Sequence, residues 1–153
     1  AGLPEVCDAA ADLIFGTGGA TMIIESSDGA PPMGAMNTVL YCEHFAATLA
    51  FYDDVMLLPR GFANDWFVEF KVAQQAFLSI ANPQRASITS AQGRGLTLTV
   101  RVDDVRACHR QLCARGALPT APGARPWGAE GFVLHDPEGT RIEIWAPSSS
   151  HLA

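Results

Sequence analysis

The chain of 153 residues has little of what would assign a function class directly. No apolar run approaches the roughly 18 residues that a membrane helix needs, so no membrane span is expected. Ten Lys+Arg stand against sixteen Asp+Glu, and the net charge of −6 disfavours nucleic acid as a partner. The four cysteines include no Cys-x-x-Cys pair, which argues against a zinc or redox site. Without a visible secretory signal, a cytoplasmic protein with reduced thiols is expected.

The composition that is present is that of an ordinary globular domain. Hydrophobic residues make up 48% of the chain and charged residues 17%, which suits one domain with a buried core. Residues 1–35 differ from the rest and are interpreted as an N-terminal extension, with a short helix over Pro4–Phe15, a strand over Thr21–Glu25 and a linker that contains Pro31-Pro32. Residues 148–153 are interpreted as a tail.

Between these ends, the pattern of strands and helices occurs twice. The first unit, residues 36–83, is predicted to contain a strand over 37–42, a helix over 46–56, and strands over 60–63, 66–72 and 76–81. The second unit, residues 95–147, is predicted to contain a strand over 96–102, a helix over 105–115 capped by Asp103, and strands near Leu118 and over 132–135 and 141–145. Each half therefore has the order strand, helix, strand, strand, strand.

The last hairpin carries the most informative residues. Asp136-Pro137-Glu138-Gly139 has tight-turn chemistry, and the strand after it places Arg141, Glu143 and Trp145 on one face. Asn37 aligns with Thr97, and residues 77–83 align with 141–147. Together these features resemble the glyoxalase/bleomycin resistance protein/dioxygenase superfamily, also called vicinal oxygen chelate. The resemblance implies an α+β fold in which tandem βαβββ units form a concave mixed β-sheet with helices outside.

The resemblance also implies where a metal would be held. Metal-binding members use side chains from the first and last strands of each unit, which align with Asn37, Ser79, Thr97 and Glu143 here. Only Glu143 is ionisable, and neutral oxygens supply little of the charge that a dehydrated divalent ion requires. The sequence therefore predicts no metal and no cofactor, with a divalent metal as the alternative.

A binding protein is the favoured interpretation. Members of the family without a metal sequester antibiotics, and Arg125-Pro126-Trp127-Gly128 resembles a stretch of bleomycin-resistance proteins. The predicted function is to hold a planar ligand, with cations among the candidates, in a cleft at a homodimer interface. The residues predicted to line this cleft are Trp66, Phe70, Trp127, Trp145, Glu143, Asn37, Ser79 and Thr97. Glu69 and Glu143 are predicted to add charge selection.

Other interpretations stay open. Large aromatics on strands are more often core residues than ligand contacts. Glu143 is compatible with an ion pair to Arg141 or Arg101. It is also compatible with the general base of a lyase or isomerase, or with a metal ligand in a glyoxalase-type enzyme. The base role requires Tyr41, His44 or His109 nearby. A sensing or dimerisation module without chemistry is a further alternative.

Overall fold

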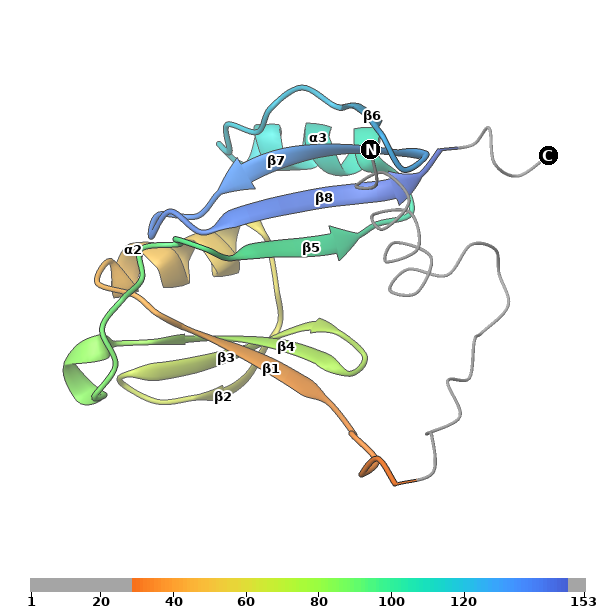
Figure 1. Ribbon diagram of the computed structural model, residues 1–153. Coiled ribbons are helices and arrows are strands. Elements are labelled where there is room, and N and C mark those ends of the chain that lie inside the picture. Colours follow the sequence, from red (N-terminus) through yellow and green to blue (C-terminus); the bar gives the residue numbers. More distant parts are fainter. Residues whose placement is uncertain (1–28, 149–153) are drawn as a thin grey trace.

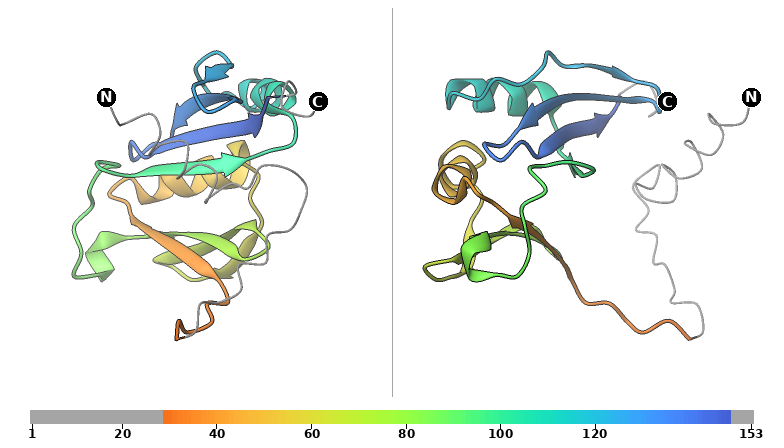
Figure 2. Two further views of the ribbon diagram at one scale, coloured as in Figure 1. Left: turned by 45° about the vertical axis from the view of Figure 1, so that its right-hand side comes forward. Right: turned by 60° about the vertical axis from the view of Figure 1, so that its left-hand side comes forward.

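In a computed structural model of the protein, the structure describes residues 29–148. The helix predicted over Pro4–Phe15, the strand predicted over Thr21–Glu25 and most of the predicted tail lie outside these residues. Two four-stranded mixed sheets lie one above the other, with helix α2 between them in every view (Figure 1, Figure 2). None of the helices between residues 29 and 148 has the length and apolar character needed to span a bilayer.

Both sheets are built in the same order from the two sequence repeats. The first unit contains β1 (Met36–Tyr41), α2 (Phe45–Ala50), the π-helical turn η1 (Phe51–Val55), β2 (Arg60–Ala63), β3 (Phe67–Ala73) and β4 (Ala76–Ala81), followed by the 3-10 turn η2 (Pro83–Arg85). The second unit contains β5 (Thr97–Arg101), α3 (Val105–Ala114), β6 (Gly123–Arg125), β7 (Ala129–His135) and β8 (Arg141–Pro147). The strand orders, β1-β4-β3-β2 and β5-β8-β7-β6, are equivalent. In each sheet the first strand is parallel to the last, and the other pairs are antiparallel.

The structure corrects the sequence prediction at three places. The strand predicted near Leu118 is wrong: Leu118 is 96% exposed, and β6 forms later, at Gly123–Arg125. Asp104, not Asp103, caps α3, because its carboxylate accepts the backbone N–H of Ala107. The first helix does not stay α-helical to Met56, since its second half is the π-helical turn η1.

One core serves both units. In each sheet, alternate side chains of the central strands are buried towards the helices, as the two-residue strand period requires. This core contains Tyr52, Phe70, Leu78, Ile80, Leu112, Phe132, Ile142 and Ile144, among others. We call the opposite side of each sheet its open face. Because the helix-side positions are fixed by burial, the intervening residues of every strand must point to the open face.

The β7–β8 turn joins the second unit to the first through two buried carboxylates, Asp136 and Glu138, which we call the carboxylate latch. The Tyr52 hydroxyl donates to Asp136 Oδ2 at 2.8 Å. Glu138 accepts the backbone N–H groups of Glu43 and His44 at 2.9 and 2.8 Å. It also accepts the Ser90 hydroxyl at 2.6 Å. Burial raises the pKa of Glu138, but these hydrogen bonds outweigh it, so its pKa lies below the ordinary value.

Candidate functional site

The open face of the second sheet carries an arginine–glutamate–arginine cluster. On β8, Ile142 and Ile144 point into the core, so Arg141 and Glu143 point to the open face. Arg125 Nε, from the end of β6, donates to Glu143 Oε1 at 2.8 Å. Arg141 Nη1 lies 3.6 Å from Glu143 Oε2. Glu143 therefore pairs with Arg141, as one interpretation of the sequence expected, but its closer partner is Arg125.

Trp127 lies beside this cluster in a pocket that we call the open-face pocket. The turn between β6 and β7 brings Trp127 close to Arg125, with the Gly128 N–H donating to the Arg125 carbonyl at 3.3 Å. Gly128 takes a φ of +73°, which favours glycine at this position. The Trp127 side chain is 39% exposed. The pocket has a volume of about 570 Å³ and is lined by Thr120, Ala121, Arg125, Trp127, Val133, Arg141 and Glu143.

Two more predicted residues lie on the same face of this sheet. Thr97, on β5, is directly opposite Arg141 in the strand register, and its hydroxyl accepts from Arg141 Nη1 at 3.4 Å. Trp145 is buried, and the guanidinium of Arg101 lies 5.9 Å from the centre of its ring. Neither residue lines the open-face pocket, although Thr97 contacts a residue that does.

The first sheet carries a separate polar cluster. Ser79, which is fully buried, donates its hydroxyl to Asn37 Oδ1 at 3.0 Å. The Asn37 amide donates to Glu69 Oε2 at 3.3 Å. A Cβ atom at position 61 would lie 2.9 Å from Glu69 Oε1, so Gly61 makes room for this carboxylate. The structure thus brings Asn37 together with Ser79, and Thr97 together with the Glu143 cluster.

The two aromatic residues predicted on β3 and just before it have different surroundings. Phe70 is fully buried in the core, with its ring 5.8 Å from that of Tyr52, so its prediction as a ligand contact is wrong. The physical reason is the strand period, which puts Phe70 and Val68 on the helix side. Trp66 is half-buried, and its ring lies 5.7 Å from that of Phe67. Trp66 does not line the open-face pocket.

The aligned ligand positions fit a divalent metal poorly. Asn37, Ser79 and Thr97 offer neutral oxygens that are already in hydrogen bonds, and the one carboxylate, Glu143, accepts from Arg125. In the part of the chain from residue 29 to 148, no three His, Cys, Asp or Glu side chains are grouped so that they could hold a metal ion. A metal bound to Glu143 Oε1 would have to displace the guanidinium of Arg125, whose Nε is 2.8 Å away.

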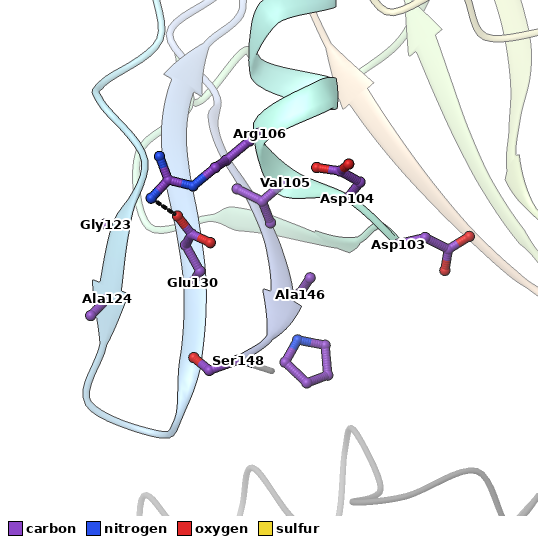
Figure 3. Close-up of a pocket in the computed structure, with 10 residues that line it drawn as sticks. Asp103, Asp104, Val105, Arg106, Gly123, Ala124, Glu130, Ala146 and Ser148 are labelled. Atoms are coloured by element: carbon purple, nitrogen blue, oxygen red, sulfur yellow. Dashed lines mark ion pairs between the residues drawn. The ribbon is translucent and has the colours of Figure 1, made fainter. Parts of the chain in front are cut away.

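A second hollow of about 590 Å³ lies at the start of α3. Figure 3 shows Arg106 of α3 and Glu130 of β7 pointing toward one another across it, and their ion pair measures 2.6 Å. Asp103 and Asp104 lie at the helix start beside it. None of the residues that the sequence predicts for the site lines this hollow, so we take the open-face pocket as the candidate site.

The sequence prediction missed the role of Arg125, the closest partner of Glu143. It also missed Thr120, whose hydroxyl accepts the Val133 N–H at 2.9 Å and holds one wall of the pocket. Arg125 directly precedes the Pro-Trp-Gly stretch, and this proximity to Trp127 was the available signal. Thr120 had no signal, because it lies in a loop without a recognisable pattern.

Comparison with protein families assigns the chain. Residues 37–145 match the family model described as glyoxalase-like domain. The chain therefore belongs to the glyoxalase-like domain family, and the resemblance predicted from the sequence is confirmed. Among curated proteins, no sequence matches the chain at a significant level.

Solved structures share the fold. A glyoxalase/bleomycin resistance protein/dioxygenase from Nocardioides aligns with a TM-score of 0.65 and 18% identity over 78% of this chain and 86% of its own. Lactoylglutathione lyase from Agrobacterium tumefaciens aligns at 0.62 and 24%, over 76% and 96%. TnmS3, an antibiotic binding protein from Streptomyces sp. CB03234, aligns at 0.63 and 20%, over 78% and 99%. At these identities the likeness shows the fold alone, and the predicted α+β fold class is confirmed.

Proposed function

We propose that the protein binds a planar small molecule, with antibiotics among the candidates, against Trp127 in the open-face pocket and without a metal. The observation that carries this proposal is the position of Trp127, which is 39% exposed and lines the same pocket as Arg125 and Glu143. An exposed indole beside polar groups that are already fixed offers a flat surface for a heterocycle. The antibiotic binding protein TnmS3 shares the fold, which is compatible with this use.

The donor chemistry supports metal-free binding. Glu143 is the one carboxylate among the four aligned positions, and its Oε1 accepts from Arg125. The guanidinium already supplies the charge compensation that a metal would provide. We expect the purified protein to take up no Ni²⁺, Zn²⁺, Mn²⁺ or Fe²⁺ at micromolar concentration, as measured by elemental analysis after titration. One equivalent of metal that is lost in Glu143→Ala would instead favour a metal-dependent enzyme.

Binding is favoured over general-base catalysis by the surroundings of Glu143. A base needs an oxygen that can reach a substrate proton, and Glu143 Oε1 is held by Arg125. The histidines that the base role required contact other residues. His44 Nδ1 lies 3.2 Å from Glu138, and His109 Nε2 lies 3.1 Å from the Thr120 carbonyl.

We further propose that the protein is a cytoplasmic homodimer and that a second copy completes the ligand cleft. Family resemblance suggests this arrangement, since each unit builds half of a groove. The large apolar side chains of Met36 and Phe62, which are 70% and 60% exposed in the single chain, are compatible with burial against another copy. Light scattering across the micromolar range should give the dimer mass, and a monomer mass throughout would contradict the proposal.

Equilibrium dialysis with naphthalene-2-carboxamide, a neutral planar probe, tests the binding function. Trp127→Ala should raise its Kd about three- to tenfold, because an aromatic contact contributes about 0.5 to 1.5 kcal/mol. Leu118→Ala is the matched control, since it removes a side chain that is 96% exposed and does not line the pocket. Equal loss in both variants would contradict the proposed function.

A further inference from the structure

Arg141 has hydrogen-bonding capacity that the protein itself does not use. A guanidinium has five N–H donors. Within residues 29–148, the polar contacts of Arg141 are to Thr97 at 3.4 Å and to Glu143 at 3.6 Å, and both are made through Nη1. Both contacts are long. The side chain is 41% exposed and lines the open-face pocket, so its Nε and Nη2 donors remain for a ligand.

Glu143 does not neutralise both arginines equally. Its short hydrogen bond goes to Arg125, and the two side chains are well shielded, with 10% and 22% of their surfaces accessible. Arg141 is farther from Glu143 and more exposed. One carboxylate between two guanidinium groups leaves a net positive charge, and this charge is located mainly on Arg141 because Arg125 has the closer partner.

The open face carries a further cation. Arg101 lies over Trp145 on this face. Glu130, the one carboxylate of β7, pairs with Arg106 of α3 at the second hollow. The chain as a whole has a net charge of −6, so this face is a positively charged region on a negatively charged protein. A local positive field attracts anions and repels cations.

We propose that the open-face pocket selects planar ligands that carry a carboxylate, with Arg141 binding the carboxylate while Trp127 stacks on the ring. This inference rests on the proposed function and gives its ligand class. The two adjacent donors of a guanidinium match the two oxygens of a carboxylate, so the pair is geometrically specific. A planar cation, which the aromatic residues alone suggested, would have to approach two arginines.

Three probes that share the naphthalene ring and carry substituents of different charge test the proposal by equilibrium dialysis. They are naphthalene-2-carboxylate, the neutral naphthalene-2-carboxamide and the cationic 2-naphthylmethylammonium. The carboxylate should bind about tenfold more tightly than the carboxamide, as expected for a charge-assisted hydrogen-bonded pair. The cation should bind most weakly. Arg141→Gln should remove the preference for the carboxylate, and added NaCl should reduce it in the wild type.

Arg94→Gln is the matched control, because Arg94 is an exposed arginine whose side chain donates to Gln92 outside the pocket. It should leave the preference unchanged. Equal binding of the three probes, weakened by Trp127→Ala, would overturn the charge selection and leave the planar-ligand function intact. A preference that persists in Arg141→Gln would overturn the assignment to Arg141. Failure of all three probes at millimolar concentration would overturn both this inference and the proposed function.

Discussion

Each unit has one carboxylate at an equivalent cross-strand pair of its sheet, but the two carboxylates lie on different strands of that pair. In the first sheet, Glu69 of β3 is opposite Ser79 of β4. In the second, Val133 of β7 is opposite Glu143 of β8. The partners also differ, since an amide faces Glu69 while two guanidinium groups face Glu143. The repeated fold therefore fixes where a polar group can stand, and the neighbouring side chains determine the charge that it presents.

The turns that precede the last strands differ as strongly. By the alignment of Phe77 with Arg141, Gln74 of the first unit corresponds to Glu138 of the second. Gln74 is exposed, whereas Glu138 is buried and accepts from the backbone of the first unit. The association of the two units is therefore asymmetric, because the second unit binds the first through the carboxylate latch.

The largest expected effect comes from giving the β7–β8 turn the residue type that the β3–β4 turn has at the aligned position. Glu138→Gln should lower the free energy of unfolding by about 2 to 4 kcal/mol, because an amide group replaces a buried charged acceptor of several hydrogen bonds. Gln74→Ala is the matched control and should stay within about 0.5 kcal/mol. Urea denaturation at neutral pH measures both. A loss for Glu138→Gln below about 1 kcal/mol would show that the latch contributes little.

The same comparison of wild type and Glu138→Gln can be extended to low pH. The pKa of Glu138 is lowered from its ordinary value of 4.5, so its contribution is present above that pH and is lost as the pH falls through the lowered pKa. The stability difference between wild type and Glu138→Gln should therefore shrink below about pH 4.5. A difference that stays constant down to pH 3 would contradict the assignment.

A smaller effect is expected at the other end of the latch. Tyr52→Phe removes the hydroxyl that donates to Asp136 Oδ2 and should destabilise the protein by about 1 to 2 kcal/mol. In the second unit the aligned residue is Leu112, which is buried but has no such donor. Tyr41→Phe, at a half-buried tyrosine on β1, is the control and should change stability little. Equal effects in thermal unfolding would remove this part of the asymmetry.

The smallest effects are expected on the open faces. Glu143→Gln should cost about 1 to 2 kcal/mol, since it leaves Arg125 with a neutral acceptor in a partly buried pair. Glu69→Gln, at the equivalent pair of the first sheet, should cost at most about 0.5 kcal/mol because its partner is an amide. Urea denaturation of the two variants in parallel gives the difference. Equal costs would mean that the arginines do not distinguish the two sheets.

The fold was accessible from the sequence because its signals are local. The boundaries predicted for Arg60–Ala63 and Ala76–Ala81 are those of β2 and β4, since alternation and turn residues mark both ends. The short strand β6 was missed, because Gly123–Arg125 has no alternation and is recognisable only by its pairing with β7. Phe70 was predicted to contact the ligand because of its residue type, and only its burial in the structure shows that it belongs to the core.

The candidate site was accessible only in part. Glu143 and Trp127 stood out by residue type and position, and the structure places both in one pocket. Arg125 reaches Glu143 from β6, with β7 between their strands, a contact between separated strands that spacing in the sequence does not reveal. The role of Glu138 was hidden because turn residues are usually solvated, and its burial depends on how the two units meet.

The carboxylate latch has a consequence for how the sequence can vary. Glu138 accepts the backbone N–H groups of residues 43 and 44, which nearly every amino acid provides in identical form. The side chain at position 43 is therefore largely released from the task of holding the units together. At position 44 the side chain also takes part, since His44 Nδ1 lies 3.2 Å from Glu138 Oε2. In a saturation library, position 43 should tolerate most substitutions except proline, which lacks the N–H. Position 44 should tolerate fewer, and position 138 almost none.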